Sequence, residues 1–417
     1  MSVRWRGRLG KIAGMTLGTA FGSLLDPPEE AAPRTALVLM GGGARTAYQV
    51  GVLLGLTHLL GRRPGGWFDI VVGTSAGALN AACLVDQAPV GAAAVERLAQ
   101  LWMGLHADQV YRVQPWRMTP GLRWAGLLSP AWLLRRLPRW LLDPAPLTAL
   151  LGRVVRPARI AQALDQGHLQ AWAVTASSYT SGVHWTFYQA ARRWHRPAWQ
   201  RPGRRAVAQA IGPQHLLASA AIPFLFPAVP LEVEGRTEYF GDGSMRQIAP
   251  LSPAFNLGAT RILAIGVGQP ERSALGAGSM APGSYPSLAQ IATHAMASVF
   301  HDTLEADVEQ AERVNAGLRR WSQHGGMAPY RAVQVLAMQP SRSLDELALA
   351  HVRALPEAVF GLLKMLGGTQ AAGAALASYL LFEPPFVQAL IELGRVDVWA
   401  RRAQLEAFFE GRPVPGA

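Results

Sequence analysis

The sequence is poor in cysteine, lysine and acidic side chains. Its 417 residues include 27 acidic residues, a single cysteine (Cys83), and only Lys11 and Lys364 as lysines. One cysteine excludes an intrachain disulfide and a zinc site built from several cysteines. Because a scarcity of cysteine also fits a reducing compartment, we expect a cytoplasmic protein.

Charged residues as a whole are scarce, at 16% of the chain against about 25% in an average soluble domain. Half of the residues are hydrophobic, so the chain can bury a sizeable core. These proportions exclude intrinsic disorder, a collagen-like chain and a coiled coil. A chain of this length forms two or three domains, or one large α/β domain with additions.

No hydrophobic run reaches the roughly 20 residues that a membrane-spanning helix needs. Residues 1–33 start with several basic side chains and continue into an apolar, glycine-rich stretch that ends near Leu25. No small-x-small cleavage site follows, so we expect an amphipathic anchor or a disordered arm rather than a secretory signal. The apolar stretch at 371–382 is too short to span a bilayer and predicts a packed helix.

The charge balance is strongly basic, with 39 Lys and Arg residues and a formal net charge of +12. Such a balance suits nucleic acid, an anionic membrane surface or acidic substrates. The arginines are scattered among tryptophans, and no zinc-finger or RNA-reading signature is present. We therefore expect peripheral contact with a membrane surface and no nucleic-acid partner. The composition indicates no particular oligomeric state.

Two strand–turn–helix units open the regular part of the chain. Residues 35–40 (TALVLM) and 68–72 (FDIVV) are short apolar runs that each end in glycine, as buried parallel strands do. Helical patterns follow at 50–60 and 76–85. This repetition predicts an α/β fold with a mainly parallel sheet and helices on its faces.

The chain divides into three predicted regions: an N-terminal arm at 1–33, an α/β domain at 34–340 and a helical region at 341–417. Within the second region we expect a helical cap insertion at about 105–165, rich in arginine and carrying Trp116, Trp124, Trp132 and Trp140. Tryptophan and arginine together suit a cap resting on a membrane. A helical subdomain with tryptophans in its core and solvated arginines accounts for the pattern equally well.

The remaining pattern indicates four more strands and a long helix. We expect strands at 171–177 and 183–188, joined as a hairpin by a Tyr-Thr-Ser-Gly turn, further strands at 261–267 and 333–338, a loop at 268–287 and a charged helix at 288–324.

The pentapeptide GTSAG at 73–77 lies between a predicted strand and a predicted helix. In this context a G-x-S-x-G sequence is typical of a nucleophile elbow, because Gly73 and Gly77 permit the tight turn that exposes Ser75. The positive end of the following helix would favour an anion at the site. A chance pentapeptide in a glycine-rich protein is the competing interpretation.

The glycine run Gly41, Gly42 and Gly43, followed by Arg45, also lies between a strand and a helix. Consecutive glycines allow backbone N–H groups to converge on an anion. A dinucleotide-binding fingerprint would need glycine where Thr46 stands. An oxyanion hole for acyl transfer needs only donors near a nucleophile, which the second strand unit supplies, so we favour the oxyanion hole over a plain glycine-rich turn.

A serine nucleophile needs a base, and two kinds are available. Asp242, followed by Gly243 in a sharp turn, comes directly after a predicted strand end. His294 and His301 lie after it, in the Ser, Asp, His order of α/β-hydrolases, and we favour an ordinary surface or core role for both. No metal-binding motif such as HExxH is present, and no cofactor is expected.

Three segments together resemble one family. GGGAR at 41–45, GTSAG at 73–77 and DGS at 242–244 are similar, in this order, to the motifs of patatin-like phospholipases, and ASAAIP at 218–223 resembles the family's sequence ahead of its aspartate. The likeness covers about 35–268 and is weaker in the C-terminal helices. It departs from the family at Thr46, where glycine is usual, and at Ser244, where glycine or alanine is usual.

The resemblance implies a patatin-like three-layer α/β/α fold and a lipid acyl hydrolase acting on lipids or phospholipids. It makes Ser75 the nucleophile and Asp242 its base in a dyad without histidine. Gly41, Gly42 and Gly43 would then supply the oxyanion donors. With an ordinary aspartate pKa near 3.9, such a base would be weak, and catalysis would depend mainly on those donors. Two alternatives stay open: a catalytically silent lipid-binding or regulatory protein on the same fold, and a His-dependent esterase.

Overall fold

The computed structural model describes residues 33–61, 66–113, 140–194, 196–268, 303–323, 331–365 and 374–415. Arg34–Ala417 form one compact unit. The predicted N-terminal arm up to residue 32, the part of the Trp/Arg-rich cap at 114–139, the loop from residue 269 onward and the two candidate histidines, His294 and His301, lie outside the described residues.

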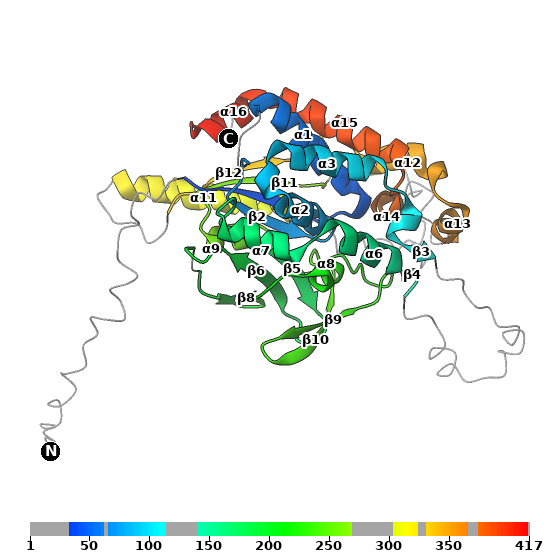
Figure 1. Ribbon diagram of the computed structural model, residues 1–417. Coiled ribbons are helices and arrows are strands. Elements are labelled where there is room, and N and C mark those ends of the chain that lie inside the picture. The colour runs from blue at the N-terminus through cyan, green and yellow to red at the C-terminus, as the bar shows by residue number, and fades with distance from the viewer. Residues whose placement is uncertain are drawn as a thin grey trace, which may run out of the picture. The chain divides into compact units, whose positions relative to one another are not determined.

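Five parallel strands form the centre of one large sheet (Figure 1). Their order is β12 (Gln334–Met338), β11 (Arg261–Ile265), β1 (Thr35–Leu39), β2 (Ile70–Thr74) and β5 (Ala171–Ser178). The pairing is in register, with Ala36 opposite Ile70 and Thr35 opposite Arg261. All five strands therefore end at the same edge, where parallel sheets carry their sites.

The sheet continues beyond β5 with further strands that pair antiparallel, except that β6 (His184–Ala190) and β8 (Arg204–Ala208) run parallel to each other. The other strands are β7 (Gln200–Arg201), β9 (Val229–Val233) and β10 (Arg236–Gly241). The predicted hairpin at 171–188 is confirmed as β5 paired with β6. β10 pairs with the last two residues of β5, which brings the end of β10 to the carboxyl edge of the parallel strands.

Helices cover both faces of the sheet, and the alternation of side chains along β1 shows this directly. Leu37 and Leu39 belong to the core shared with α1 (Ala47–Leu60) and α2 (Ala76–Asp86). Ala36 and Val38 point the other way, into the core shared with α9 (Ser252–Leu257) and α11 (Leu304–Gln323). The predicted three-layer α/β/α architecture with a mainly parallel sheet is confirmed.

Shorter elements complete the described part of the chain. They are η2 (Gly43–Thr46), η3 (Ala88–Val90), α3 (Ala92–Met103), α4 (Ala107–Val110), β3 (Arg112–Val113), β4 (Leu142–Asp143), α6 (Ala145–Val154), α7 (Pro157–Asp165), α8 (Pro213–Ser219), α12 (Leu344–His351), η5 (Val352–Ala354), α13 (Glu357–Met365), α14 (Ala374–Leu380), α15 (Pro384–Ala400) and α16 (Arg402–Glu410).

The C-terminal helix α15 packs directly on α1 (Figure 1). A Cβ at Gly394 would lie 2.4 Å from the carbonyl oxygen of Tyr48, so only glycine allows the two helices to approach this closely. The Tyr48 hydroxyl donates a buried hydrogen bond of 2.9 Å to Asp397. Helices at both ends of this unit therefore share one core. Among the described residues, no helix combines the length and apolarity needed to cross a membrane.

Candidate active site

Ser75 occupies a strained turn between β2 and α2. Its φ is 54°, a left-handed conformation that few non-glycine residues adopt. A Cβ at Gly77 would lie 2.4 Å from the carbonyl oxygen of Met40, and one at Gly73 would lie 2.5 Å from the Cα of Ala78. Both glycines are therefore required by backbone contacts, as the predicted elbow demands. Strain of this kind is characteristic of functional positions.

Asp242 lies just beyond the end of β10 and faces Ser75. The Ser75 hydroxyl donates a 2.6 Å hydrogen bond to Oδ2 of Asp242. The segment 219–221 fixes this turn, because the backbone N–H groups of Asp242 and Gly243 donate to the carbonyl oxygens of Ala221 and Ser219 at 2.9 and 3.0 Å. The structure thus joins two side chains that are 167 positions apart in the sequence.

Asp242 is completely buried, with an exposed fraction of 0%. Burial raises the pKa of its carboxyl to about 6, although the hydrogen bonds from Ser75 and Ser244 act in the opposite direction. The expectation of an ordinary pKa near 3.9 was wrong, because it treated Asp242 as a solvated turn residue. A carboxylate with this pKa is a considerably stronger base and is still ionised at neutral pH.

The glycine loop lies directly in front of Ser75. A Cβ at Gly41 would lie 2.8 Å from the Cβ of Ser75, so any side chain there would occupy the space beside the nucleophile. Within the described residues, the backbone N–H groups of Gly41, Gly42 and Gly43 have no hydrogen-bond acceptor. Three donors at the start of a helical segment are thus available to an anion.

Thr46, which departs from the usual family pattern, fits the loop through a local hydrogen bond. Its side chain is buried, and its hydroxyl donates to the carbonyl oxygen of Gly43 at 2.8 Å. This bond closes the turn of η2 that leads from the glycines into α1. A hydroxyl here therefore supports the loop, and no close backbone contact requires glycine at this position.

Arg45 anchors the glycine loop to the C-terminal helices. Its guanidinium donates a 2.7 Å hydrogen bond to the Ser378 hydroxyl on α14, pairs with Asp345 on α12 and lies 4.3 Å from the centre of the Tyr379 ring. A Cβ at Gly43 would lie 2.2 Å from the carbonyl oxygen of Tyr379. Arg45 and Gly43 therefore both contact the C-terminal helices, which hold the glycine loop in place.

The sequence interpretation did not assign a role to Ser219. Its hydroxyl accepts a 2.8 Å hydrogen bond from the backbone N–H of Ser75, and its carbonyl oxygen accepts one from Gly243. Ser219 thus joins the two turns that carry Ser75 and Asp242. The segment at 218–223 had been noted only for its family likeness, and nothing in its local pattern indicated this contact.

A buried histidine near Ser75 and Asp242 contacts the backbone and not the Asp242 carboxylate. Nε2 of His184 lies 2.9 Å from the carbonyl oxygen of Gly243. Burial lowers the pKa of His184 to about 4, so the imidazole is neutral at pH 7. It therefore stabilises the turn after Asp242. Among the described residues, no three His, Cys, Asp or Glu side chains are grouped as a metal site would require.

One family model matches a large part of the chain. The family model described as patatin-like phospholipase matches residues 37–255, which is more than half of the chain. The matched segment contains the glycine loop, Ser75 and Asp242. No curated protein matches the chain.

Proposed function

The chain belongs to the patatin-like phospholipase family, and from this we propose that it is a serine lipid acyl hydrolase that uses Ser75 and Asp242 as a catalytic dyad. Membership of the family implies hydrolysis of lipid esters. The dyad, the oxyanion site and the membrane contact described below are the finer parts of the proposal.

The observation that carries the proposal is the 2.6 Å hydrogen bond from the Ser75 hydroxyl to a buried carboxylate whose pKa is raised to about 6. A general base must lie within hydrogen-bond reach of the proton it removes, with a pKa near the working pH. Asp242 meets both conditions. The same side chain, if solvated, would be about 100 times less basic.

In the proposed reaction, Asp242 accepts the hydroxyl proton as Ser75 Oγ attacks the ester carbonyl carbon. The carbonyl oxygen becomes an oxyanion that accepts hydrogen bonds from the amides of Gly41, Gly42 and Gly43. Asp242 then protonates the departing alcohol as the acyl-enzyme forms. Water attacks this ester with Asp242 again as base, and Asp242 then gives the proton to Ser75 Oγ as the bond to the acyl group breaks and the fatty acid leaves. Donors that are held in place before substrate arrives give strong electrostatic stabilisation, and a loop packed against Ser75 suits this role.

We further propose that the site works at a lipid surface, through an apolar rim formed by Tyr179, Phe224, Tyr239 and Ile248. Their exposed fractions are 48, 73, 54 and 67%. All four belong to segments beside the Asp242 turn. Phe224 follows the segment 219–221 that hydrogen-bonds this turn, and Ile248 comes shortly after the turn. Tyr179 directly follows β5, and Tyr239 lies on β10. Groups of exposed apolar and aromatic side chains are typical of membrane-contacting surfaces.

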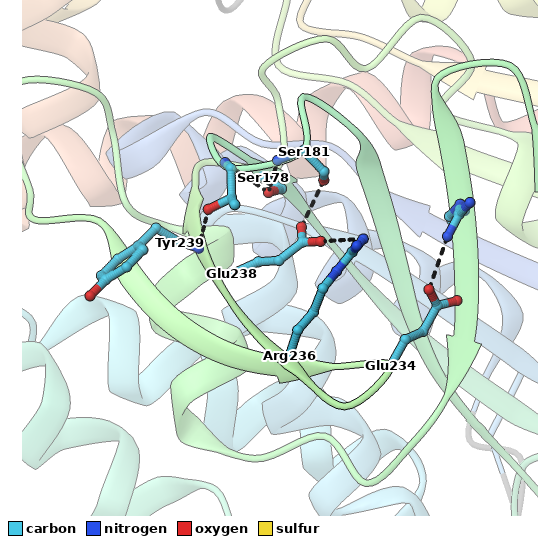
Figure 2. Close-up of polar contacts among 8 residues, drawn as sticks. Ser178, Ser181, Glu234, Arg236, Glu238 and Tyr239 are labelled. Atoms are coloured by element: carbon cyan, nitrogen blue, oxygen red, sulfur yellow. Dashed lines mark hydrogen bonds and ion pairs between the residues drawn. The ribbon is translucent and has the colours of Figure 1, made fainter.

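A buried carboxylate keeps part of this rim rigid (Figure 2). Glu238 on β10 accepts a 2.7 Å hydrogen bond from the Ser181 hydroxyl and pairs with Arg236 at 2.8 Å. The backbone N–H of Tyr239 donates to the Thr180 hydroxyl at 3.0 Å. The turn after β5 is thereby held against β10, and both rim tyrosines are carried by fixed backbone.

A covalent probe tests the nucleophile directly. An alkyl fluorophosphonate should phosphonylate Ser75, because its phosphorus accepts the same attack as an ester carbonyl. Mass spectrometry of a digest should find one modified peptide, containing GTSAG. Modification of a different serine, or of Ser75→Ala at the same rate, would contradict the proposal.

A further inference from the structure

Ser244 lies beside the reacting groups, although the residue usual in the family has no hydroxyl there. A Cβ at Gly41 would lie only 2.2 Å from Oγ of Ser244, so this hydroxyl occupies the notch that the missing Gly41 side chain leaves. The Cβ of Ser75 borders the same notch, at 2.8 Å. The Ser244 hydroxyl therefore faces the nucleophile and the first glycine of the loop at once.

The backbone of Ser244 is held rigidly while its hydroxyl is uncommitted. The N–H of Ser244 donates a 2.8 Å hydrogen bond to Oδ1 of Asp242. Its Oγ is buried and makes no hydrogen bond of acceptable geometry with any described residue. The hydroxyl also lies near the Asp242 carboxylate, where it acts to lower the pKa of that carboxyl.

A buried hydroxyl without a partner lowers the stability of the free protein. Alanine would remove that cost and fits the same space. Such a group calls for an explanation, and a catalytic role, in which a reaction intermediate supplies the partner, is one. The developing oxyanion is an acceptor that forms within this space, because it must lie near Ser75 and in front of the glycine amides.

We propose that the Ser244 hydroxyl is a catalytic side-chain donor that hydrogen-bonds the oxyanion together with the amides of the glycine loop. The inference rests on the proposed function, since it needs Ser75 as the nucleophile. It assigns this chain an oxyanion site of mixed backbone and hydroxyl donors.

The test compares Ser244→Ala with the wild type and with Ser341→Ala, which removes an exposed hydroxyl elsewhere. With a medium-chain p-nitrophenyl ester, and on the pH plateau where Asp242 is ionised, Ser244→Ala should lose about 10- to 100-fold in kcat with little change in KM. Its resistance to urea should be equal or higher, because an unsatisfied hydroxyl is gone. An alkyl boronic acid, whose adduct places an oxygen at the oxyanion position, should bind Ser244→Ala more weakly by a similar factor. Ser244→Gly, a second deletion of the hydroxyl, should behave alike.

Two results would overturn the inference. The first is full kcat in Ser244→Ala on the pH plateau, with only a shift of the acid limb, which would leave Ser244 as a neighbour of Asp242. The second is a loss of kcat that accompanies a loss of stability, which would make its role structural. Neither result bears on the proposal that Ser75 and Asp242 form the dyad. That proposal would fail if turnover survived in Ser75→Ala.

Discussion

The carboxylate of Asp242 accepts the Ser75 hydroxyl at 2.6 Å in a position without solvent exposure. Because burial raises the pKa of Asp242 to about 6, the base is protonated below that pH and cannot accept the serine proton. We expect kcat/KM to fall about tenfold per pH unit below pH 6 and to be level above it until another group titrates.

A pH profile of soluble-ester hydrolysis measures this limb. His294→Ala and His301→Ala should keep both the limb and the rate, because the base is a carboxylate in this account. A midpoint near pH 4 would show that burial does not raise the pKa of the base, and a midpoint above pH 7 would show that Asp242 is not the titrating base. Loss of the limb in either histidine variant would favour the His-dependent esterase instead.

The same pKa shift predicts that Asp242 destabilises the fold at neutral pH. The folded pKa of about 6 lies above the ordinary 3.8, so the folded state binds the proton more tightly than the unfolded state. The protonated Asp242 carboxyl therefore stabilises the folded state. This contribution to the free energy of unfolding is complete below pH 3.8 and is lost as the pH rises through 6. A shift of this size corresponds to about 3 kcal/mol in full, of which about 2 kcal/mol is lost between pH 4 and 7.

Asp242→Asn isolates this contribution, because every other titrating group is present in both proteins. Urea unfolding of the two proteins should show the wild type losing about 2 kcal/mol relative to the variant as the pH rises from 4 to 7. A difference that is constant over this range would mean that Asp242 is not buried as an ionised group.

The apolar rim predicts a separation between dispersed and aggregated substrates. Phe224→Asp and Ile248→Asp each replace an exposed apolar side chain by a charge, and aspartate also tolerates the positive φ of 65° at residue 224. Loss of one buried apolar side chain at a lipid surface costs about 2 kcal/mol. We therefore expect at least about a tenfold loss of turnover on anionic phospholipid vesicles and unchanged turnover of a soluble ester.

Trp399→Asp is the matched control, since Trp399 is an exposed aromatic residue on α15. It should leave vesicle turnover at the wild-type level. Equal losses on both substrates in the rim variants would place the defect in the catalytic centre. Equal losses in Trp399→Asp would indicate a general effect of added negative charge on a protein with a net charge of +12.

Local patterns predicted the local parts of the fold. The apolar run before GTSAG and the small residues after it predicted β2 and α2, and the structure has both, with β2 starting at Ile70 instead of residue 68. The close approach of Gly77 to β1 follows from the same turn. Such features depend on neighbouring residues, so sequence pattern alone identifies them.

Contacts between segments that are distant in the sequence were harder to predict. The pairing of Ser75 with Asp242 was expected from the order of the family's motifs, not from any periodicity. The bond from Ser75 to Ser219 and the pairing of Arg45 with Asp345, 300 positions away, were not foreseen. The pKa of Asp242 depends on how completely these segments exclude water, and a one-dimensional pattern does not contain that quantity.

The measurement that tests the central claim most directly is release of p-nitrophenol from a medium-chain ester by the wild type, Ser75→Ala and Asp242→Asn. Asp108→Asn, which changes an exposed aspartate, and Ser341→Ala serve as matched controls. With all five proteins folded, we predict turnover in the wild type and both controls, and a loss of at least about 10³-fold in each dyad variant. Turnover that persists in Ser75→Ala, or a wild type that binds lipid vesicles without hydrolysing any ester, would contradict the assignment.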